Sequence, residues 1–184
     1  MIYYQRSNMN IQEKKSVIEA LLFVAGEPVA LSTIKSATEI PEAEIKQILD
    51  GLVADYKERN GGLSIVEIAN GYRMVTSPGC SQWIRRFMNT NTSSKLSMAA
   101  LETLAIVAYN QPVIKAEIEQ IRGVNSDGVM KTLLERRLIK IMGRKEMPGR
   151  PLLYGTTREF LQYFGLKDLT ELPTIKELNR EEAA

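Results

Sequence analysis

The sequence predicts a mainly α-helical fold with small β-hairpins (α+β), arranged as two tandem winged-helix domains. Two observations carry this prediction: the order helix–helix–helix–hairpin occurs twice, and matching apolar residues recur at equal distances from two Pro-Val pairs. Counted from Pro28 and Pro112, the matches lie six, seventeen and twenty-one positions on: Ile34 with Ile118, Ile45 with Val129, and Leu49 with Leu133. Such repetition indicates two copies of one structural unit.

Residues 1–88 are interpreted as the first winged-helix domain. Apolar residues at helical spacing predict a helix over residues 10–25, and Ser32 is a candidate N-cap for a short second helix. Pro41 opens a third helix that ends at Asn60. The pair Asn70-Gly71, between two runs of branched and aromatic residues, predicts a β-hairpin. A last helix over residues 81–88 is expected to pack onto this domain through Trp83, Ile84 and Phe87.

Residues 89–96 form a predicted polar linker, and residues 97–165 form the second winged-helix domain. Helices are expected from Ser97 to Asn110, around Ile118, and from Asn125 or Ser126 onward. The segments IKIMGRK and PLLYGTT predict two strands joined by EMPGR. A final helix follows, for which Thr156 and Glu159 fit a capping box. Residues 166–184 are polar and acidic with little to bury, so we expect a partly disordered C-terminal tail.

The composition disfavours an enzyme or a metal site. The 184 residues carry a net charge of +2, no histidine and a single cysteine, Cys80. The commonest general base and metal ligand is therefore missing, and one cysteine builds neither a zinc site nor a disulfide. No apolar stretch approaches the ~20 residues that span a bilayer, and the N-terminal residues lack an apolar signal core. We expect an intracellular binding or scaffold protein without catalytic residues, cofactor or metal.

Winged helices often bind DNA through their third helix and hairpin, so a DNA-binding transcriptional regulator is the alternative function. The third helix of the first domain holds five acidic and three basic residues, which is a poor surface for phosphate. A basic cluster remains in residues 136–150, with one acidic residue, Glu146, among Arg136, Arg137, Lys140, Arg144, Lys145 and Arg150. This cluster is either a solvated hairpin edge, a weak phosphate contact or a docking site for an acidic partner segment.

Residues 96–173 strongly resemble the second winged helix of the segregation and condensation protein B family, the bacterial condensin accessory subunits. The most specific matches are AALETLAIVAYNQP, IRGVNSDGV, and GRPLLYGTT followed by EFLQYFGL. The first domain resembles the family more loosely, through EALLFVAGEPV and the hairpin GGLSIVEIANGYRMVT.

This resemblance implies a cytoplasmic, nucleoid-associated and non-enzymatic homodimer that acts in chromosome condensation and partition at cell division. Its partner would be the kleisin subunit, segregation and condensation protein A, which bridges the heads of an SMC ATPase. DNA contact would be weak or indirect, and no membrane is involved. In the family, the first domain mainly dimerises and the second mainly holds the kleisin.

Apolar side chains in excess of a small core are candidates for these two interfaces. For dimerisation through the first domain, we expect Leu21, Phe23 and Trp83 to contribute. For the kleisin, we expect a groove on the second domain with aromatic anchors and basic residues at its rim: Tyr109, Tyr154, Arg144 and Arg150.

Overall fold

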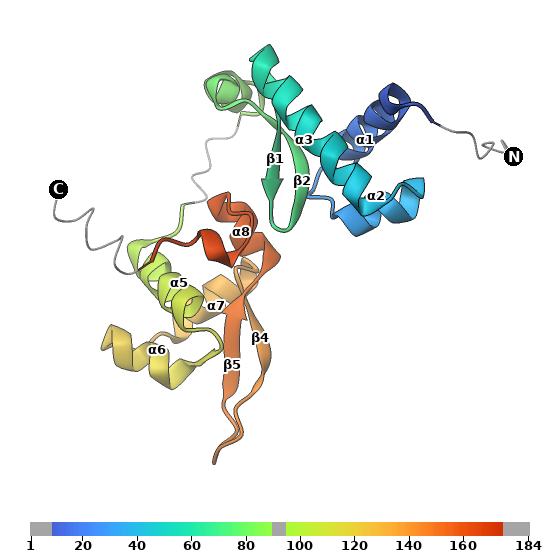
Figure 1. Ribbon diagram of the computed structural model, residues 1–184. Coiled ribbons are helices and arrows are strands. Elements are labelled where there is room, and N and C mark those ends of the chain that lie inside the picture. The colour runs from blue at the N-terminus through green and yellow to red at the C-terminus, as the bar shows by residue number, and fades with distance from the viewer. Residues whose placement is uncertain (1–8, 90–94, 175–184) are drawn as a thin grey trace, which may run out of the picture. The chain divides into compact units, whose positions relative to one another are not determined.

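The computed structural model describes residues 9–89 and 95–174 of the chain. The chain divides into two compact units, Met1–Asn91 (unit 1) and Thr92–Ala184 (unit 2), and this division falls inside the predicted linker. Residues 90–94 of that linker lie outside the described residues. Each unit combines several helices with a small antiparallel sheet, so the predicted mainly α-helical α+β class is confirmed (Figure 1).

Unit 1 contains three helices, a two-stranded hairpin and a short last helix. These elements are α1 (Ile11–Ala25), α2 (Leu31–Thr38), α3 (Glu42–Arg59), β1 (Leu63–Ile68), β2 (Gly71–Thr76), the 3-10 turn η1 (Pro78–Cys80) and α4 (Ser81–Phe87). Asn10 caps α1, because its side chain accepts a hydrogen bond from the backbone N–H of Glu13 while the Glu13 carboxylate accepts one from the backbone N–H of Asn10. The core lies between α1, α2, α3 and the hairpin, and its fully buried members include Ile18, Leu22, Ile34, Ile45 and Leu49.

The hairpin of unit 1 turns one residue earlier than predicted. Ile68 pairs with Gly71, so the two-residue loop consists of Ala69 and Asn70, both with positive φ, and Gly71 is the first residue of β2. Gly71 is needed for another reason. A β-carbon at this position would lie 2.7 Å from the carbonyl oxygen of Val29, which forms a β-bridge with Tyr72.

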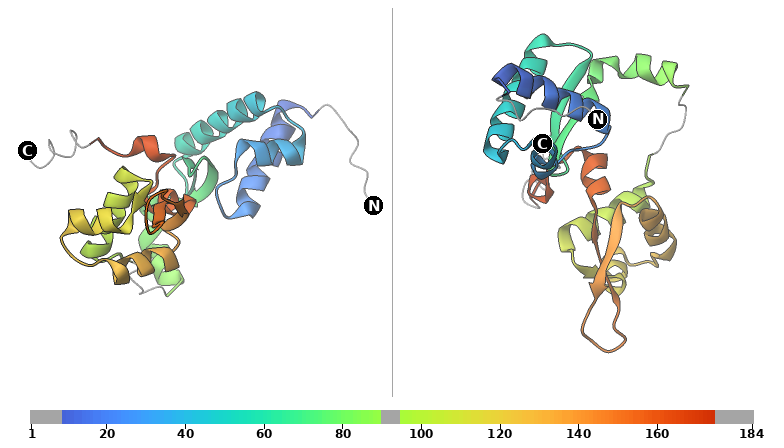
Figure 2. Two further views of the ribbon diagram at one scale, coloured as in Figure 1. Left: turned by 90° about the horizontal axis from the view of Figure 1, so that it is seen from below. Right: turned by 90° about the vertical axis from the view of Figure 1, so that its right-hand side faces the viewer.

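Two further predictions for unit 1 are wrong. The N-cap of α2 is Ala30 rather than Ser32, and no side chain caps this helix end. Helix α4 does not pack Trp83 and Phe87 onto the domain, because none of its residues is buried in the described part of the chain. In Figure 2 (right), α4 extends outward from the other elements of unit 1.

Unit 2 repeats the helical order with one additional short strand. Its elements are α5 (Met98–Asn110), β3 (Val113–Ile114), α6 (Lys115–Arg122), α7 (Asp127–Glu135), β4 (Ile139–Arg144), β5 (Leu152–Thr156), α8 (Arg158–Phe164) and the 3-10 turn η2 (Leu169–Glu171). The sheet has the antiparallel order β3–β5–β4, so β4 is an edge strand. Strand β3 was not predicted, because two residues are too short for an alternating pattern.

The sequence repeat corresponds to structurally equivalent core positions in most cases. Ile34 and Ile118 are both buried, as are Leu49 and Leu133. Ile45 has a different counterpart, because Val129 is only half-buried and the neighbouring Met130 lies in the core instead.

Two details of unit 2 differ from the predictions. The N-cap of α8 is Thr157, whose hydroxyl accepts a hydrogen bond from the backbone N–H of Phe160, and Thr156 ends β5. Residues 166–174 of the predicted tail are described and include η2, whereas residues 175–184 lie outside the described residues. Across the described ranges, no helix is both long and apolar enough to span a membrane.

Candidate interaction surfaces

One face of α5 is apolar and exposed. Met98, Leu101, Ala105 and Tyr109 follow one another at spacings of three or four residues, which places them in one row along the helix. Met98 is 71% exposed and Tyr109 is 38% exposed, while the opposite face of α5 lies in the core of unit 2. We call these four residues the α5 stripe.

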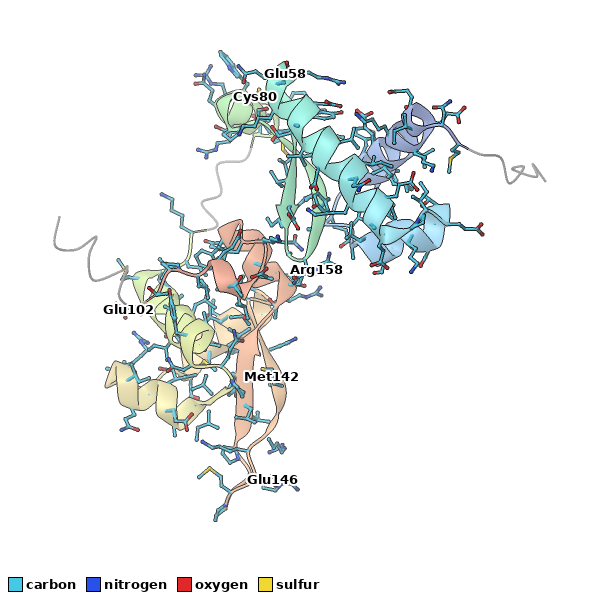
Figure 3. The ribbon with its side chains drawn as sticks, viewed as in Figure 1. Glu58, Cys80, Glu102, Met142, Glu146 and Arg158 are labelled. Carbon is cyan, nitrogen blue, oxygen red and sulfur yellow. The ribbon has the colours of Figure 1, made fainter. Side chains whose placement is uncertain are left out.

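Polar contacts lie beside the α5 stripe. The hydroxyl of Tyr109 donates a hydrogen bond to the carbonyl oxygen of Pro173 at 2.6 Å, which holds the segment after α8 against the end of α5. Glu102, labelled in Figure 3, forms a 3.1 Å ion pair with Arg122 of α6. An apolar centre with charged groups at its margin is typical of surfaces that bind another protein.

Helix α4 carries a second exposed apolar surface. Trp83 and Phe87 are one helical turn apart and are 59% and 89% exposed, and Met88 follows them. The guanidinium of Arg86 lies 5.3 Å from the centre of the Trp83 ring, a cation–π geometry that orients the indole. Aromatic side chains this exposed are a typical mark of a protein–protein contact.

The three residues suggested for the dimer interface do not form one patch. Leu21 is half-buried against the core of unit 1, whereas Phe23 is 72% exposed near the end of α1. Trp83 lies on α4, and Figures 1 and 2 place α1 and α4 at opposite ends of unit 1. Two separate surfaces of unit 1 are therefore available, one at Phe23 and one at Trp83.

The residues suggested for kleisin binding are also divided. Arg144 and Arg150 lie together near the tip of the β4–β5 hairpin, where the Arg144 guanidinium donates to the Arg150 carbonyl oxygen at 3.0 Å. Tyr154 is 8% exposed and pairs with Val113 across the sheet, so it supports the core and offers little surface. Tyr109 alone joins a larger apolar surface, the α5 stripe. Sequence reasoning missed the rest of that stripe because the apolar face of α5 continues around the helix, and spacing alone does not tell which side is buried.

The third helix of each unit pairs a lysine with groups of its own unit. In α3, the ammonium of Lys46 donates to the Tyr72 hydroxyl and lies 2.9 Å from the Asp50 carboxylate. These contacts, the Tyr72 hydrogen bond first, raise the pKa of Lys46 above its usual value. In α7, Lys131 lies 4.0 Å from Glu135. Neither helix presents a set of unpaired cations, which disfavours the reading of DNA bases expected of a regulator.

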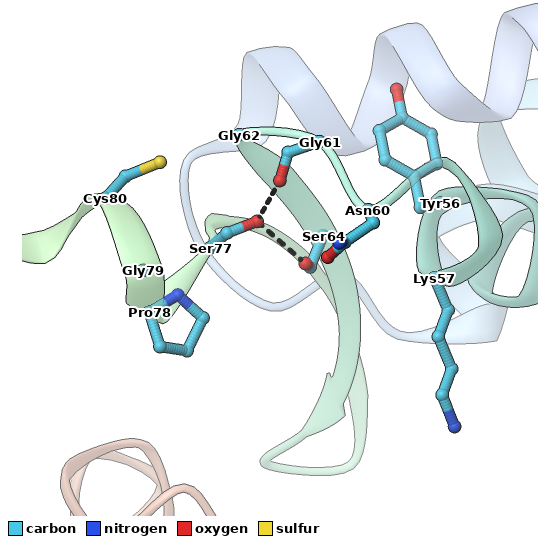
Figure 4. A pocket seen from close by; sticks show the side chains of 10 residues that line it. All are labelled: Tyr56, Lys57, Asn60, Gly61, Gly62, Ser64, Ser77, Pro78, Gly79 and Cys80. Atoms are coloured by element: carbon cyan, nitrogen blue, oxygen red, sulfur yellow. Dashed lines mark hydrogen bonds between the residues drawn. The ribbon is translucent and has the colours of Figure 1, made fainter.

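A shallow pocket of about 510 Å³ lies in unit 1 where α3, β1 and η1 meet (Figure 4). The Ser77 hydroxyl donates to the Gly61 carbonyl and lies 3.4 Å from the Ser64 hydroxyl, and Cys80 is half-buried. The lining residues include no carboxylate, and the chain has no histidine, so no general base accompanies these hydroxyls or the thiol. No group of three or more potential metal ligands occurs among the described residues either.

Comparison with known proteins decides the family. The model of the family described as "Segregation and condensation complex subunit ScpB" matches residues 16–175, which cover most of both units. The chain belongs to the segregation and condensation protein B family. The resemblance noted from the sequence is thereby confirmed, and it extends over the first domain as well as the second.

Named family members cover most of this chain. It is 48% identical over 169 residues to segregation and condensation protein B of Syntrophotalea carbinolica, covering 92% of this chain and 85% of the relative. It is 46% identical to the protein of the same name from Clostridium tetani, covering 90% and 88%. Among solved structures, a dimer of the ScpB N-terminal domain complexed with ScpA peptide is 27% identical and covers 42% of this chain and 96% of that chain, with a TM-score of 0.40.

Proposed function

We propose that this protein is a non-catalytic subunit of a bacterial SMC–kleisin complex, which acts in chromosome condensation and partition. It does so as a homodimer that binds the kleisin, segregation and condensation protein A. Membership of a family described as a complex subunit supports this role. ATP hydrolysis belongs to the SMC partner. The protein works in the cytoplasm at the nucleoid.

The exposed α5 stripe is the observation that supports a particular kleisin-binding surface on unit 2. Four apolar side chains at helical spacing, all exposed among the described residues, match the way an amphipathic helix is recognised, by contacts at intervals of three and four residues. The α5 stripe therefore forms the surface of unit 2 that contacts an apolar helix of the kleisin. Arg144 and Arg150 lie on the hairpin and do not belong to this surface.

Co-purification of the full chain with the kleisin, with measured stoichiometry, tests this proposal. Leu101→Glu places a charge in the centre of the α5 stripe and should weaken kleisin binding at least about thirtyfold, as expected for an anchor worth about 2 kcal/mol. The matched control is Gln120→Glu, at an exposed position of α6. Unchanged binding by Leu101→Glu would remove the stripe from the interface, and failure of the native chain to bind any kleisin would reject the function.

Homodimerisation is assigned to α4. A symmetric dimer needs one self-complementary surface. Helix α4 offers two adjacent exposed aromatic side chains, Trp83 and Phe87, whereas α1 offers only one, Phe23. Light scattering after size exclusion should give about twice the chain mass of 20.7 kDa for the native protein. The double variant Trp83→Ala/Phe87→Ala should give the mass of one chain, and the control Phe23→Ala should remain dimeric. The reverse pattern would place the interface at the end of α1.

A further inference from the structure

The hairpin of unit 2 concentrates the positive charge of its surroundings. We call residues 136–150, which include β4 and the loop that follows it, the basic wing. This segment holds six basic residues and one acidic residue, a net charge of +5. The remainder of residues 89–165 holds five basic and six acidic residues, a net charge of −1. All the excess positive charge of this region therefore lies in one segment.

Most of this charge is not neutralised within the protein. Arg137, Lys140, Arg144 and Arg150 are exposed, and none of them forms an ion pair with a carboxylate in residues 9–89 or 95–174. Lys145 differs, because it pairs with Glu117 at 2.7 Å. Four cations thus remain available to an external anion.

The shape of the basic wing fits an extended, regularly charged partner. Strands β4 and β5 run beyond the other elements of unit 2, and the loop between them forms the tip (Figures 1 and 2). The six residues of β4 extend over about 20 Å. Double-stranded DNA carries one negative charge per about 1.7 Å of its axis, so a projecting ribbon of this length faces several phosphates at once.

Other features of unit 2 disfavour two kinds of partner, DNA bases read by α7 and a peptide strand added to β4. Helix α7, which would read bases, exposes Asp127 and Glu135 and adds no unpaired cation. Strand β4 is an edge strand, but its pairing shifts at a bulge between Ile141 and Gly143, and bulges and charged residues both discourage the addition of a peptide strand. The charge is therefore better placed for a phosphate backbone than for base edges or an acidic β-strand.

We propose that the basic wing contacts the phosphate backbone of double-stranded DNA without reading its sequence. The contact is weak and depends steeply on salt, since each phosphate neutralised releases a condensed counterion. It is a second interaction of the protein, separate from the α5 stripe and from α4. The subunit thereby holds DNA next to the complex that it joins.

Fluorescence anisotropy of two labelled 30-base-pair duplexes of unrelated sequence, titrated with the full-length protein, tests the proposal. Both duplexes should bind equally, and the logarithm of the association constant should fall with the logarithm of salt concentration with a slope of about −3 to −4, as expected for four cations. A preference for one duplex would overturn the proposal in favour of base reading. No binding at about 25 mM salt would overturn it outright.

Matched variants locate the contact. Lys140→Gln/Arg150→Gln should reduce the salt slope by about 2 and weaken binding at about 50 mM salt at least tenfold. The control Lys35→Gln/Lys57→Gln removes the same charge from exposed helical positions of unit 1 and should leave binding within about twofold of native. Equal weakening by both pairs would show a net-charge effect and overturn the proposal. Loss of kleisin binding with intact DNA binding in the wing variant would assign the charge to an acidic peptide instead.

Discussion

The Nζ atom of Lys145, directly after β4, lies 2.7 Å from Oε1 of Glu117 in the first turn of α6. The other oxygen of the same carboxylate accepts a hydrogen bond from the backbone N–H of Ile114 at 3.1 Å. Both contacts lower the pKa of Glu117 below its ordinary value of 4.5, and the contact with Lys145 has the larger effect. The ion pair thus connects the loop between β4 and β5 to helix α6.

Replacement of Glu117 by Gln should lower the melting temperature of unit 2 at pH 7. A carboxyl whose pKa is lower in the folded chain stabilises the fold above the unfolded pKa, and this contribution is lost as the pH falls through the folded value. The difference in melting temperature between native protein and Glu117→Gln should therefore be largest at neutral pH and shrink progressively as the pH falls below about 4.5. Thermal circular dichroism measures it. Glu146→Gln, at the exposed hairpin tip, is the control, and a difference independent of pH would contradict the ion pair.

Gly71→Ala should destabilise unit 1 by about 1–3 kcal/mol, because the added methyl meets the backbone of Val29 at 2.7 Å and this backbone cannot yield without breaking the bridge to Tyr72. Urea unfolding followed by circular dichroism gives the change. Gly61→Ala, where nothing lies within 4 Å of the new methyl, should stay within about 0.5 kcal/mol of native. Equal stability of the two variants would refute the role given to Gly71.

Asn70-Gly71 shows how far the sequence leads at such a turn. The pair correctly predicts a hairpin at this place, since both residues favour positive φ. Because Asn70 and Gly71 suit the loop equally well, the register depends on a contact between distant residues, the bridge from Val29 to Tyr72. That bridge fixes Gly71 in the strand and moves Ala69 into the loop, and no local pattern reveals it.

Gln111→Ala should destabilise unit 2 by about 1–3 kcal/mol. The side-chain oxygen of Gln111 accepts hydrogen bonds from the backbone N–H and the hydroxyl of Thr156 at 2.7 and 3.0 Å, and Thr156 is buried. Truncation leaves two buried donors without a partner. Denaturant unfolding provides the comparison with Gln120→Ala, whose side chain is exposed and which should be nearly neutral.

The same two hydrogen bonds explain the misplaced cap of α8. Thr156 and Thr157 are equivalent candidates by sequence, and Glu159 favours Thr156 through the capping-box spacing. Gln111 occupies both donors of Thr156, so the neighbouring Thr157 caps the helix. A partner 45 positions away in the chain thus decides the helix boundary.

Leu49→Ala and Leu133→Ala should each destabilise the unit that contains the residue by about 2–5 kcal/mol, since both leucines are fully buried at equivalent positions of the repeat. Met98→Ala, at a side chain that is 71% exposed, serves as the control and should cost less than about 0.5 kcal/mol in folding. Calorimetry of the three variants measures the effects. A small change in the free energy of unfolding for either buried leucine would contradict the equivalence of the two core positions.

The core pattern was predictable from apolar spacing, whereas the binding surfaces were only partly so. Trp83 and Tyr154 are both aromatic residues in apolar segments; the sequence suggested a kleisin contact for Tyr154, and for Trp83 both packing onto the first domain and a dimer contact. Trp83 is exposed because α4 extends away from the core, and Tyr154 is buried because β3 and β4 flank its strand. The side on which each ring lies depends on elements that the local sequence does not specify.

The hydrogen bond from Tyr109 to Pro173 has a practical consequence for anyone who labels this protein. Whatever is fused behind residue 174 leaves the fold beside the α5 stripe. A fluorescent protein joined directly after residue 174 would therefore begin beside the surface to which we assign the kleisin, and such a fusion should weaken kleisin capture.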